Sequence, residues 1–526
     1  MSSFSHFLIS GIISIFGIKK FFPTFALHCI LHCFHWNILI MRILFYITLF
    51  LSLLACDSKE KKEEVTPLLF PDNTQMLFRI NDKDNFLSAI ANNTFWKTHN
   101  PHQLRPHEVK LLNSIPTDDN LWVAFDTEGH FFAITPHISN DTISFWRNAD
   151  TQIQKQAQFG KEWFYTIADN NLVIGDSETV SAYQQLKQET KTPRQQSLEQ
   201  LQKVGNTECV ATLFFQKDEA NAYFKSFFGT EILQNVKDWV SLDLFLEENN
   251  IRFSGMALIA NANADIMAHT LPYQNNVLNV LPARLRSLVS YTFDDGDKLA
   301  QNDSTATNNP FKTSINGVAF AQTSEGQFAV ASSFDVDETI KQLPVLSEDF
   351  QHNFSMYELN PDLPMDFFTA FVPQFVPKYV GVYEKFLVFT TTKDLLTSVI
   401  NDMQRGNVLS ANKSYDWLEQ NSASNVSVTR LTNLYDNTAF SSKYPYIAEN
   451  YRWAVFQQTP QNDYYVLNFI SQKQTESTLS DEMKERFRLT LDDQMVIPPT
   501  ILLNHRTKQL EIAVQDTNND LYLIGN

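Results

Sequence analysis

The chain has 526 residues, of which 43% are hydrophobic and 19% are charged, a composition typical of folded domains rather than disordered chains. Its 41 basic and 59 acidic residues give a net charge of −18, which argues against a nucleic-acid partner, because binding phosphates requires a basic face. The four cysteines are too few for a disulfide-stapled scaffold, and the 14 glycines disfavour a glycine-rich phosphate loop.

Residues 1–56 are far more apolar than the rest and contain no acidic residue. Read directly, they hold one or two apolar helices, and the chain would then be a helix-anchored membrane protein. From Met41 onward, however, a basic residue and an apolar run precede the small residue Ala55 and then Cys56. This is the arrangement of a secretory signal peptide. The segment Leu53-Leu54-Ala55-Cys56 resembles the lipobox of bacterial lipoproteins.

The lipobox resemblance implies that the chain is cut before Cys56 and that lipid on this cysteine holds the protein to a bilayer. We therefore expect an untranslated upstream extension at 1–40, a signal peptide at 41–55, and a lipidated cysteine with a charged tether at 56–66. The run Asp57–Glu64 contains no apolar side chain and favours a solvated tether. It resembles the tethers of Bacteroidetes-type envelope lipoproteins. This resemblance implies an outer-membrane lipoprotein on the periplasmic or the surface face.

Sequence landmarks recur along the body of the chain in the same order. Pro71 opens a polar stretch followed by an alternating strand, and Pro282, 211 residues later, opens the same pattern. Trp239 begins a later strand, and Trp453 begins a similar strand 214 residues after it. Two further landmarks recur with similar separations. This regularity indicates an internal duplication. The alternative is that β-rich sequences share a similar succession of strands and helices without any duplication.

The duplicated body predicts two similar units, at 67–270 and 271–475. Alternating side chains predict antiparallel hairpins, as in Leu242–Leu246 followed by Ile251–Ile259, and helical runs lie between strands. We therefore expect an α+β fold: two similar units with mostly antiparallel sheets covered by helices. The layout resembles an uncharacterised duplicated-domain family of bacterial envelope proteins, which implies this fold and no particular activity.

The tail at 495–526 predicts a C-terminal β meander. Its ending Leu521-Tyr522-Leu523 resembles a blade at the start of a β-propeller, which needs several blades to bury its faces. We expect an incomplete β module, either because the chain is truncated after Asn526 or because these strands add to the sheet of the second unit.

In the body of the chain, two groups of residues could bind metal ions. His99, His102 and His107 lie close in sequence, but Pro101 and Pro106 break any helix that could align them, which favours a solvated loop. The run Asp294-Asp295-Gly296-Asp297 could ligate calcium, yet it lacks a twelve-residue loop with a terminal glutamate, so an acidic turn is favoured.

Catalytic signals are weak throughout the chain. Cys209 lies in a buried-strand pattern, which favours an inert thiol over a nucleophile. The aromatic run Phe367–Pro377 could form an exposed binding patch, but core packing explains it at least as well. No serine elbow, zinc-protease motif or phosphate loop is present. We assign no catalytic residue, cofactor or metal, and only Cys56 as a modification site.

Two functions fit these observations. The sequence favours a non-enzymatic envelope lipoprotein, anchored to the lipid bilayer through Cys56, that serves as a scaffold or binding module for a protein or a cell-surface polymer. The alternative is an envelope hydrolase with a dispersed active site, which predicts a deep pocket between the units with convergent carboxylates or histidines.

Overall fold

The computed structural model describes residues 67–524, apart from 116–120, 137–150, 187–190, 205, 207, 300–309, 352–353, 364–365, 373, 475–494, 497–498, 504–509 and 519. The described strands form two antiparallel sheets, one of 19 strands and one of three. The segments expected to be the upstream extension, signal peptide and tether (1–40, 41–55 and 56–66) lie outside the described residues, and so does Cys56.

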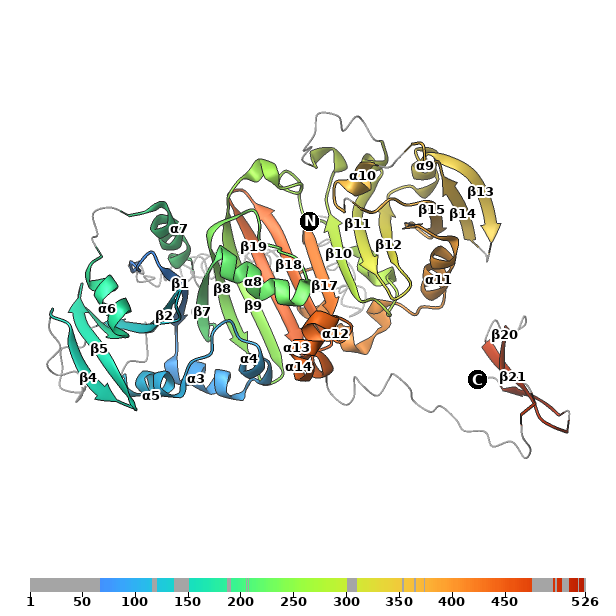
Figure 1. Cartoon of the computed structure of the whole chain (residues 1–526). Helices are drawn as coiled ribbons and strands as arrows, with labels where there is room; N and C mark the ends of the chain where they lie inside the picture. The colour runs from blue at the N-terminus through green and yellow to red at the C-terminus, as the bar shows by residue number, and fades with distance from the viewer. Residues whose placement is uncertain are drawn as a thin grey trace, which may run out of the picture. The chain divides into compact units, whose positions relative to one another are not determined.

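The first half of the body supplies nine strands of the large sheet (Figure 1). Aromatic and β-branched side chains fill most of these strands and favour extended, pleated backbone. Hydrogen bonding places them in the order β4-β5-β6-β3-β2-β1-β7-β8-β9. Their bounds are β1 Thr74–Ile80, β2 Leu121–Asp126, β3 Phe131–Pro136, β4 Gln154–Gln158, β5 Lys161–Ala168, β6 Asn171–Gly175, β7 Ala211–Gln216, β8 Val236–Leu246 and β9 Asn250–Ile259.

The second half supplies the other strands of this sheet. They lie in the order β13-β14-β15-β16-β12-β11-β10-β17-β18-β19. Strands β1 to β3 correspond to β10 to β12, and β4 to β9 correspond to β14 to β19, so β13 has no counterpart among the described strands. The bounds are β10 Ser287–Thr292, β11 Ile315–Gln322, β12 Gln327–Ser333, β13 Val345–Gln351, β14 Phe354–Leu359, β15 Tyr379–Tyr383, β16 Phe386–Thr390, β17 Val428–Asn433, β18 Trp453–Gln461 and β19 Tyr464–Gln472.

The two halves join where β9 pairs with β19, a junction that we call the seam. The residue pairs of the seam run from Asn250 with Gln472 to Leu258 with Tyr464, and Ser254 faces Asn468 at the middle. In the flanking hairpins, Ser254 pairs with Asp243 and Asn468 pairs with Gln457. Both correspondences are 214 residues apart, so Ser254 and Asn468 hold equivalent positions. Equivalent residues that face each other across an antiparallel pair define a local two-fold axis.

The expectation of an α+β fold, with two units whose sheets are covered by helices, is wrong. The described residues are mostly β, and both halves contribute to one antiparallel sheet that helices cover only in part (Figure 1). The sheet is open, because the described strands β4 and β13 each pair on one side only. Side-chain alternation reveals strands but not which edges will meet, since the free N–H and C=O groups of an edge have no side-chain signature.

Helices connect many of the strands and have clear local causes. Helix α7, for example, begins with a capping box, in which Thr192 Oγ1 accepts from the Gln195 backbone N–H at 3.2 Å and Gln195 Oε1 accepts from the Thr192 backbone N–H at 3.0 Å. Pro193 then occupies the first turn, where its missing N–H costs nothing. The bounds are α3 Lys83–Asn92, α4 Thr94–Thr98, α5 Pro106–Ser114, α6 Ser177–Gln184, α7 Pro193–Gln202, α8 Lys217–Phe228, α9 Val336–Lys341, α10 Asp366–Thr369, α11 Lys393–Gln404, α12 Lys413–Asn421, α13 Thr438–Lys443 and α14 Pro445–Asn450.

One hydrophobic core crosses the seam. The Phe224 ring of α8 lies 5.0 Å from that of Phe456 on β18 and 5.6 Å from that of Phe469 on β19, measured between centroids. Phe95 of α4 likewise lies 5.0 Å from Tyr451, which follows α14. Helices of both halves therefore bury the same aromatic layer, and burial of this layer stabilises the junction together with the backbone pairing.

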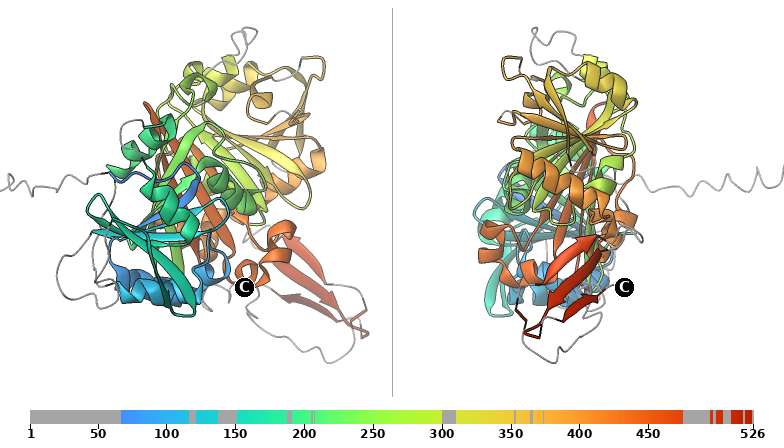
Figure 2. Two further views of the ribbon diagram at one scale, coloured as in Figure 1. Left: turned by 60° about the vertical axis from the view of Figure 1, so that its left-hand side comes forward. Right: turned by 90° about the vertical axis from the view of Figure 1, so that its right-hand side faces the viewer.

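The C-terminal strands form a sheet of their own. Strands β20 (Thr500–Leu503), β21 (Leu510–Gln515) and β22 (Leu521–Ile524) make an antiparallel meander, drawn in red in Figure 2. Ile501 and Leu523 are 67% and 59% exposed. The described part of 495–526 is thus a meander that does not join the large sheet, and its assignment as an incomplete β module stays a prediction.

The seam core gives a first prediction, on stability. Replacing Phe469 with alanine removes a ring that is 1% exposed and leaves a cavity at the junction. We expect a loss of about 3–5 kcal/mol in the free energy of unfolding, measured by urea denaturation. The control is Phe350→Ala on β13, where the ring is 69% exposed, and the expected change is within about 0.5 kcal/mol. Equal effects of the two substitutions would contradict the role of the seam core.

Candidate functional site

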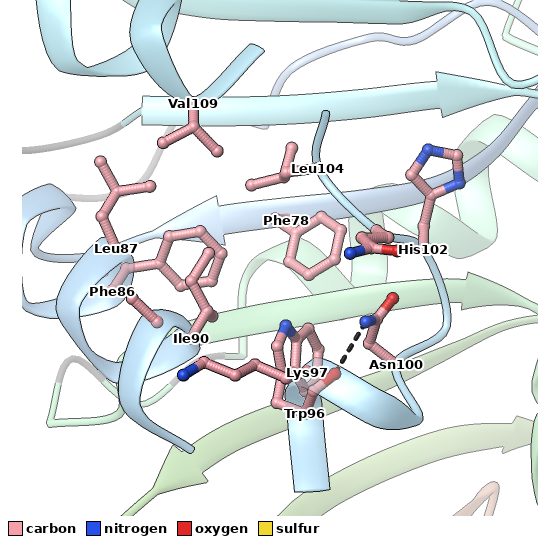
Figure 3. Close-up of a pocket in the computed structure, with 12 residues that line it drawn as sticks. Phe78, Phe86, Leu87, Ile90, Trp96, Lys97, Asn100, His102, Leu104 and Val109 are labelled. Carbon is pink, nitrogen blue, oxygen red and sulfur yellow. Dashed lines mark hydrogen bonds between the residues drawn. The ribbon is translucent and has the colours of Figure 1, made fainter. Parts of the chain in front are cut away.

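An apolar pocket lies between β1, helices α3 and α4, and the segment that leads into α5 (Figure 3). Its volume is about 190 Å³. Most of its wall is aromatic or aliphatic, formed by Phe78, Phe86, Leu87, Ile90, Leu104 and Val109. An apolar cavity of about 150 Å³ can hold one benzene ring. The pocket is therefore large enough for a single ring or a short alkyl chain.

Local capping places the helices around this pocket. Asp82 caps α3, and its carboxylate accepts from the Asn85 backbone N–H at 2.9 Å. Asn93 ends α3 and also caps α4, because its side-chain oxygen accepts from the Trp96 backbone N–H at 2.8 Å. The Asn93 side-chain nitrogen donates to the carbonyl of Glu247 at 2.6 Å, which fixes the turn between the helices to the β8–β9 hairpin. The tight α3–α4 turn brings Trp96 to the pocket.

The polar side chains of the pocket are donors or neutral groups. Lys97 is exposed and has no ion pair with any described residue. The side-chain nitrogen of Asn100 donates to the Trp96 carbonyl at 2.7 Å. Burial, with a smaller contribution from the Arg105 charge, lowers the pKa of His102 to about 4, so this ring is neutral at pH 7. Its centroid lies 3.7 Å from that of Phe125. None of the residues that line the pocket is acidic.

The three histidines considered as metal ligands lie in different surroundings. His102 lines the pocket, whereas His107 lies beside Trp163, with 5.8 Å between ring centroids. His99 is enclosed by aromatic rings, 4.7 Å from Phe227 and 4.4 Å from Tyr444. Within the described part of the chain, no three histidine, cysteine or carboxylate side chains converge as a metal site would need.

His99 forms part of the packing between the two halves of the body. It lies after α4 in the first half, and Tyr444 lies between α13 and α14 in the second. Its Nε2 is 2.8 Å from Ser226 Oγ. Burial, followed by repulsion from the Lys443 charge, lowers the pKa of His99 to about 4. The neutral imidazole is therefore the form that fits between the rings.

A polar row crosses the middle of the large sheet. Paired residues along this row share one face, because directly opposed side chains of adjacent strands project to the same side. The row runs through Arg79, Thr212, Asp243, Ser254, Asn468, Gln457, Thr429 and Ser290. Its first half carries an arginine and an aspartate, and the equivalent positions of the second half carry serine and glutamine.

The charged end of this row is a buried network. Arg79, which is 6% exposed, donates to Thr212 Oγ1 at 3.2 Å, and that hydroxyl donates to Asp243 Oδ1 at 2.7 Å. Burial raises the pKa of Asp243 and lowers that of Arg79. Burial and the nearby Asp243 charge raise the pKa of Cys209 to about 11. The Cys209 thiol is thus protonated at neutral pH, which does not suit a nucleophile.

The other sequence-predicted residues have structural surroundings. Asp294 pairs with Lys298 and accepts from the Leu271 backbone N–H at 2.8 Å, and Asp295 accepts from the Asp297 backbone N–H at 2.9 Å, as in a capped turn. In the aromatic run 367–377, the side chains of Phe368 and Phe375 are buried in the second-half core.

Cys56, the predicted lipidation site, lies outside the described residues, so its geometry is not part of the site. Among the described residues, no helix combines the length and apolar character that crossing a bilayer needs.

Sequence reasoning missed the pocket, although part of its signal is visible. Phe86, Leu87 and Ile90 follow helical spacing, and Pro101 ends the helical stretch that contains Trp96 and Lys97. Such spacing predicts a buried helix face equally well. The hollow itself depends on how α3, α4 and the segment before α5 are angled, which the spacing does not encode.

The lowered pKa of His99 gives a second prediction, on pH dependence. Unfolding restores the ordinary pKa near 6.5, so between pH 6.5 and 4 the unfolded chain binds a proton that the fold excludes. Stability should therefore fall on acidification, by about 2 kcal/mol for His99 between pH 7 and pH 5. His99→Phe should remove this part of the pH dependence of the unfolding free energy, measured by urea denaturation at each pH. His269→Phe, at an exposed position, should retain it. An unchanged slope in His99→Phe would refute the assignment.

Comparisons with known proteins give little guidance. No protein-family model matches the chain. No curated protein matches it. Among solved structures, the chain is similar to TP0453 in its crystal form I, at 12% identity, over 38% of this chain and 81% of that one, with a TM-score of 0.23. A likeness this weak carries no conclusion about fold or function.

Proposed function

We propose that the protein is an envelope lipoprotein, held to the outer membrane by lipid on Cys56, whose folded body is a scaffold or binding module. The observation that carries this proposal is Leu53-Leu54-Ala55-Cys56, preceded by a basic residue and an apolar run and followed by a charged tether. Two or more acyl chains are needed for stable attachment, and a triacylated cysteine supplies them. The body then carries the function, and its partner is a protein or a cell-surface polymer.

The free edge of the large sheet supports a role in binding. Strand β13 has no counterpart among the described strands of the first half, and it pairs only with β14 among the described strands. Its side chains Leu346 and Phe350 are 62% and 69% exposed, whereas the opposite edge strand β4 has the polar sequence Gln-Lys-Gln-Ala-Gln. An exposed edge strand that carries large apolar side chains is a template for pairing with an extended segment of another protein.

The donor-lined pocket also supports binding rather than hydrolysis. A hydrolase with a dispersed site would use carboxylates to activate water or protonate a leaving group. The pocket residues supply one lysine, one neutral histidine, two amides and an apolar wall. This chemistry suits recognition of an apolar group, and no described observation favours the hydrolase alternative.

The anchor gives a third prediction. Replacing Cys56 with serine removes the thiol that receives lipid, so the protein should leave the membrane fraction or accumulate as an uncut precursor. Fractionation, with mass spectrometry of the amino-terminal peptide, measures both outcomes. The matched control is Cys209→Ser, which changes a buried cysteine of the body and should leave attachment intact. If the Cys56 variant stays membrane-bound and contains peptides from residues 1–40, the protein is helix-anchored and the proposal is wrong.

A further inference from the structure

The pocket between β1, α3 and α4 contains a buried donor that has no acceptor among the described residues. Trp96 is 5% exposed, and no described residue accepts a hydrogen bond from its indole Nε1. The nitrogen is not one of the fully enclosed, unpaired side-chain atoms of the described residues, so it retains some solvent-accessible surface. Figure 3 shows it on the side of the ring that faces the pocket interior. A ligand that fills the pocket without accepting from this N–H would leave it unpaired, which is costly.

A cation also lines this pocket. Lys97 follows Trp96 in α4, lines the same pocket and has no ion pair with any described residue. The remaining polar lining residues, Asn100, His102 and Gln103, carry no negative charge. An ammonium group and an N–H donor beside an apolar wall match an anionic acceptor attached to an apolar group. A cationic ligand would find no partner for its charge among these residues.

We infer that this pocket binds a small organic carboxylate, with the apolar part against Phe78 and Phe86 and the carboxylate at Trp96 and Lys97. The volume limits the apolar part to one aromatic ring or a short alkyl chain. The carboxylate accepts from the indole N–H and pairs with the ammonium group. The inference goes beyond the protein or polymer partner proposed above: it assigns a small ligand to the pocket, and it does not depend on the anchor.

The test uses the full chain in lipid nanodiscs, labelled with 5-fluorotryptophan and read by fluorine NMR. The chain contains eight tryptophans, and Trp96→Phe identifies the signal of Trp96. Benzoate and hexanoate should shift this signal and saturate it. Benzylamine, with the same ring and the opposite charge, should not, and dodecanoate should bind less well than hexanoate because its chain exceeds the pocket. Empty nanodiscs give the blank.

Substitutions separate the charge from the cavity. Lys97→Met keeps an apolar stem and should weaken benzoate binding about tenfold while leaving the affinity for neutral benzyl alcohol unchanged, because only the charge-assisted bond is lost. Lys110→Met, at an exposed lysine of α5 that does not line the pocket, is the matched control. Ile90→Trp fills the pocket and should abolish binding of both ligands, and Leu104→Phe serves if the first variant does not fold.

Three results would overturn the inference: no shift of the Trp96 signal with either carboxylate, equal binding of benzoate and benzylamine, or unchanged benzoate affinity in Lys97→Met. Failure here is distinguishable from failure of the anchor, because the fractionation of Cys56→Ser does not involve the pocket. The Cys56→Ser variant could leave the membrane while the pocket fails to bind carboxylates. Conversely, the pocket could bind carboxylates while Cys56→Ser stays membrane-bound, so the two experiments test the two proposals separately.

Discussion

The backbone pairing of β9 with β19 is the interaction on which the rest of the structure depends. It joins two strand arrays, which share the order of their nine equivalent strands, into one sheet. It also removes two edges that would otherwise present unpaired N–H and C=O groups. Because Ser254 faces its equivalent Asn468, the register of this pairing also fixes the local two-fold axis. The shared aromatic layer of Phe224, Phe456 and Phe469 exists only because the seam brings the halves together.

Local elements could be predicted from the sequence, and their assembly could not. The β8–β9 hairpin was expected from the alternation in Leu242–Leu246 and Ile251–Ile259, and β8 and β9 include those residues. The predicted α+β architecture was wrong because the prediction assumed that each half forms its own sheet and covers it with its own helices. Whether an edge strand is covered by a helix or paired with another strand depends on backbone groups that every residue has in common.

In the candidate site, too, the sequence indicates local features but not how the tertiary structure places them. The placement of His102 beside Phe125 and the enclosure of His99 by aromatic rings arise from helices that meet at angles set by tertiary packing. The sequence showed three nearby histidines and two prolines, which favoured a solvated loop. That expectation is wrong for His99, which is 6% exposed, and burial lowers the pKa values of His99 and His102. By contrast, the lipobox resemblance at Cys56 depends on contiguous residues alone and requires no fold, and lipidation at Cys56 stays a prediction.

The segment that joins the first two strands differs between the two halves, and this difference bears on the number of binding pockets per chain. In the first half, residues 81–120 join β1 to β2 and contain α3, α4 and α5, which build the pocket. In the second half, the shorter segment 293–314 joins β10 to β11, and its described residues contain no α-helix. A symmetric ancestor with two equal connections could have bound two ligands cooperatively across its axis. With the pocket-forming helices α3 to α5 in the first connection only, the ligand binding that we propose has one site per chain, and its isotherm should be hyperbolic.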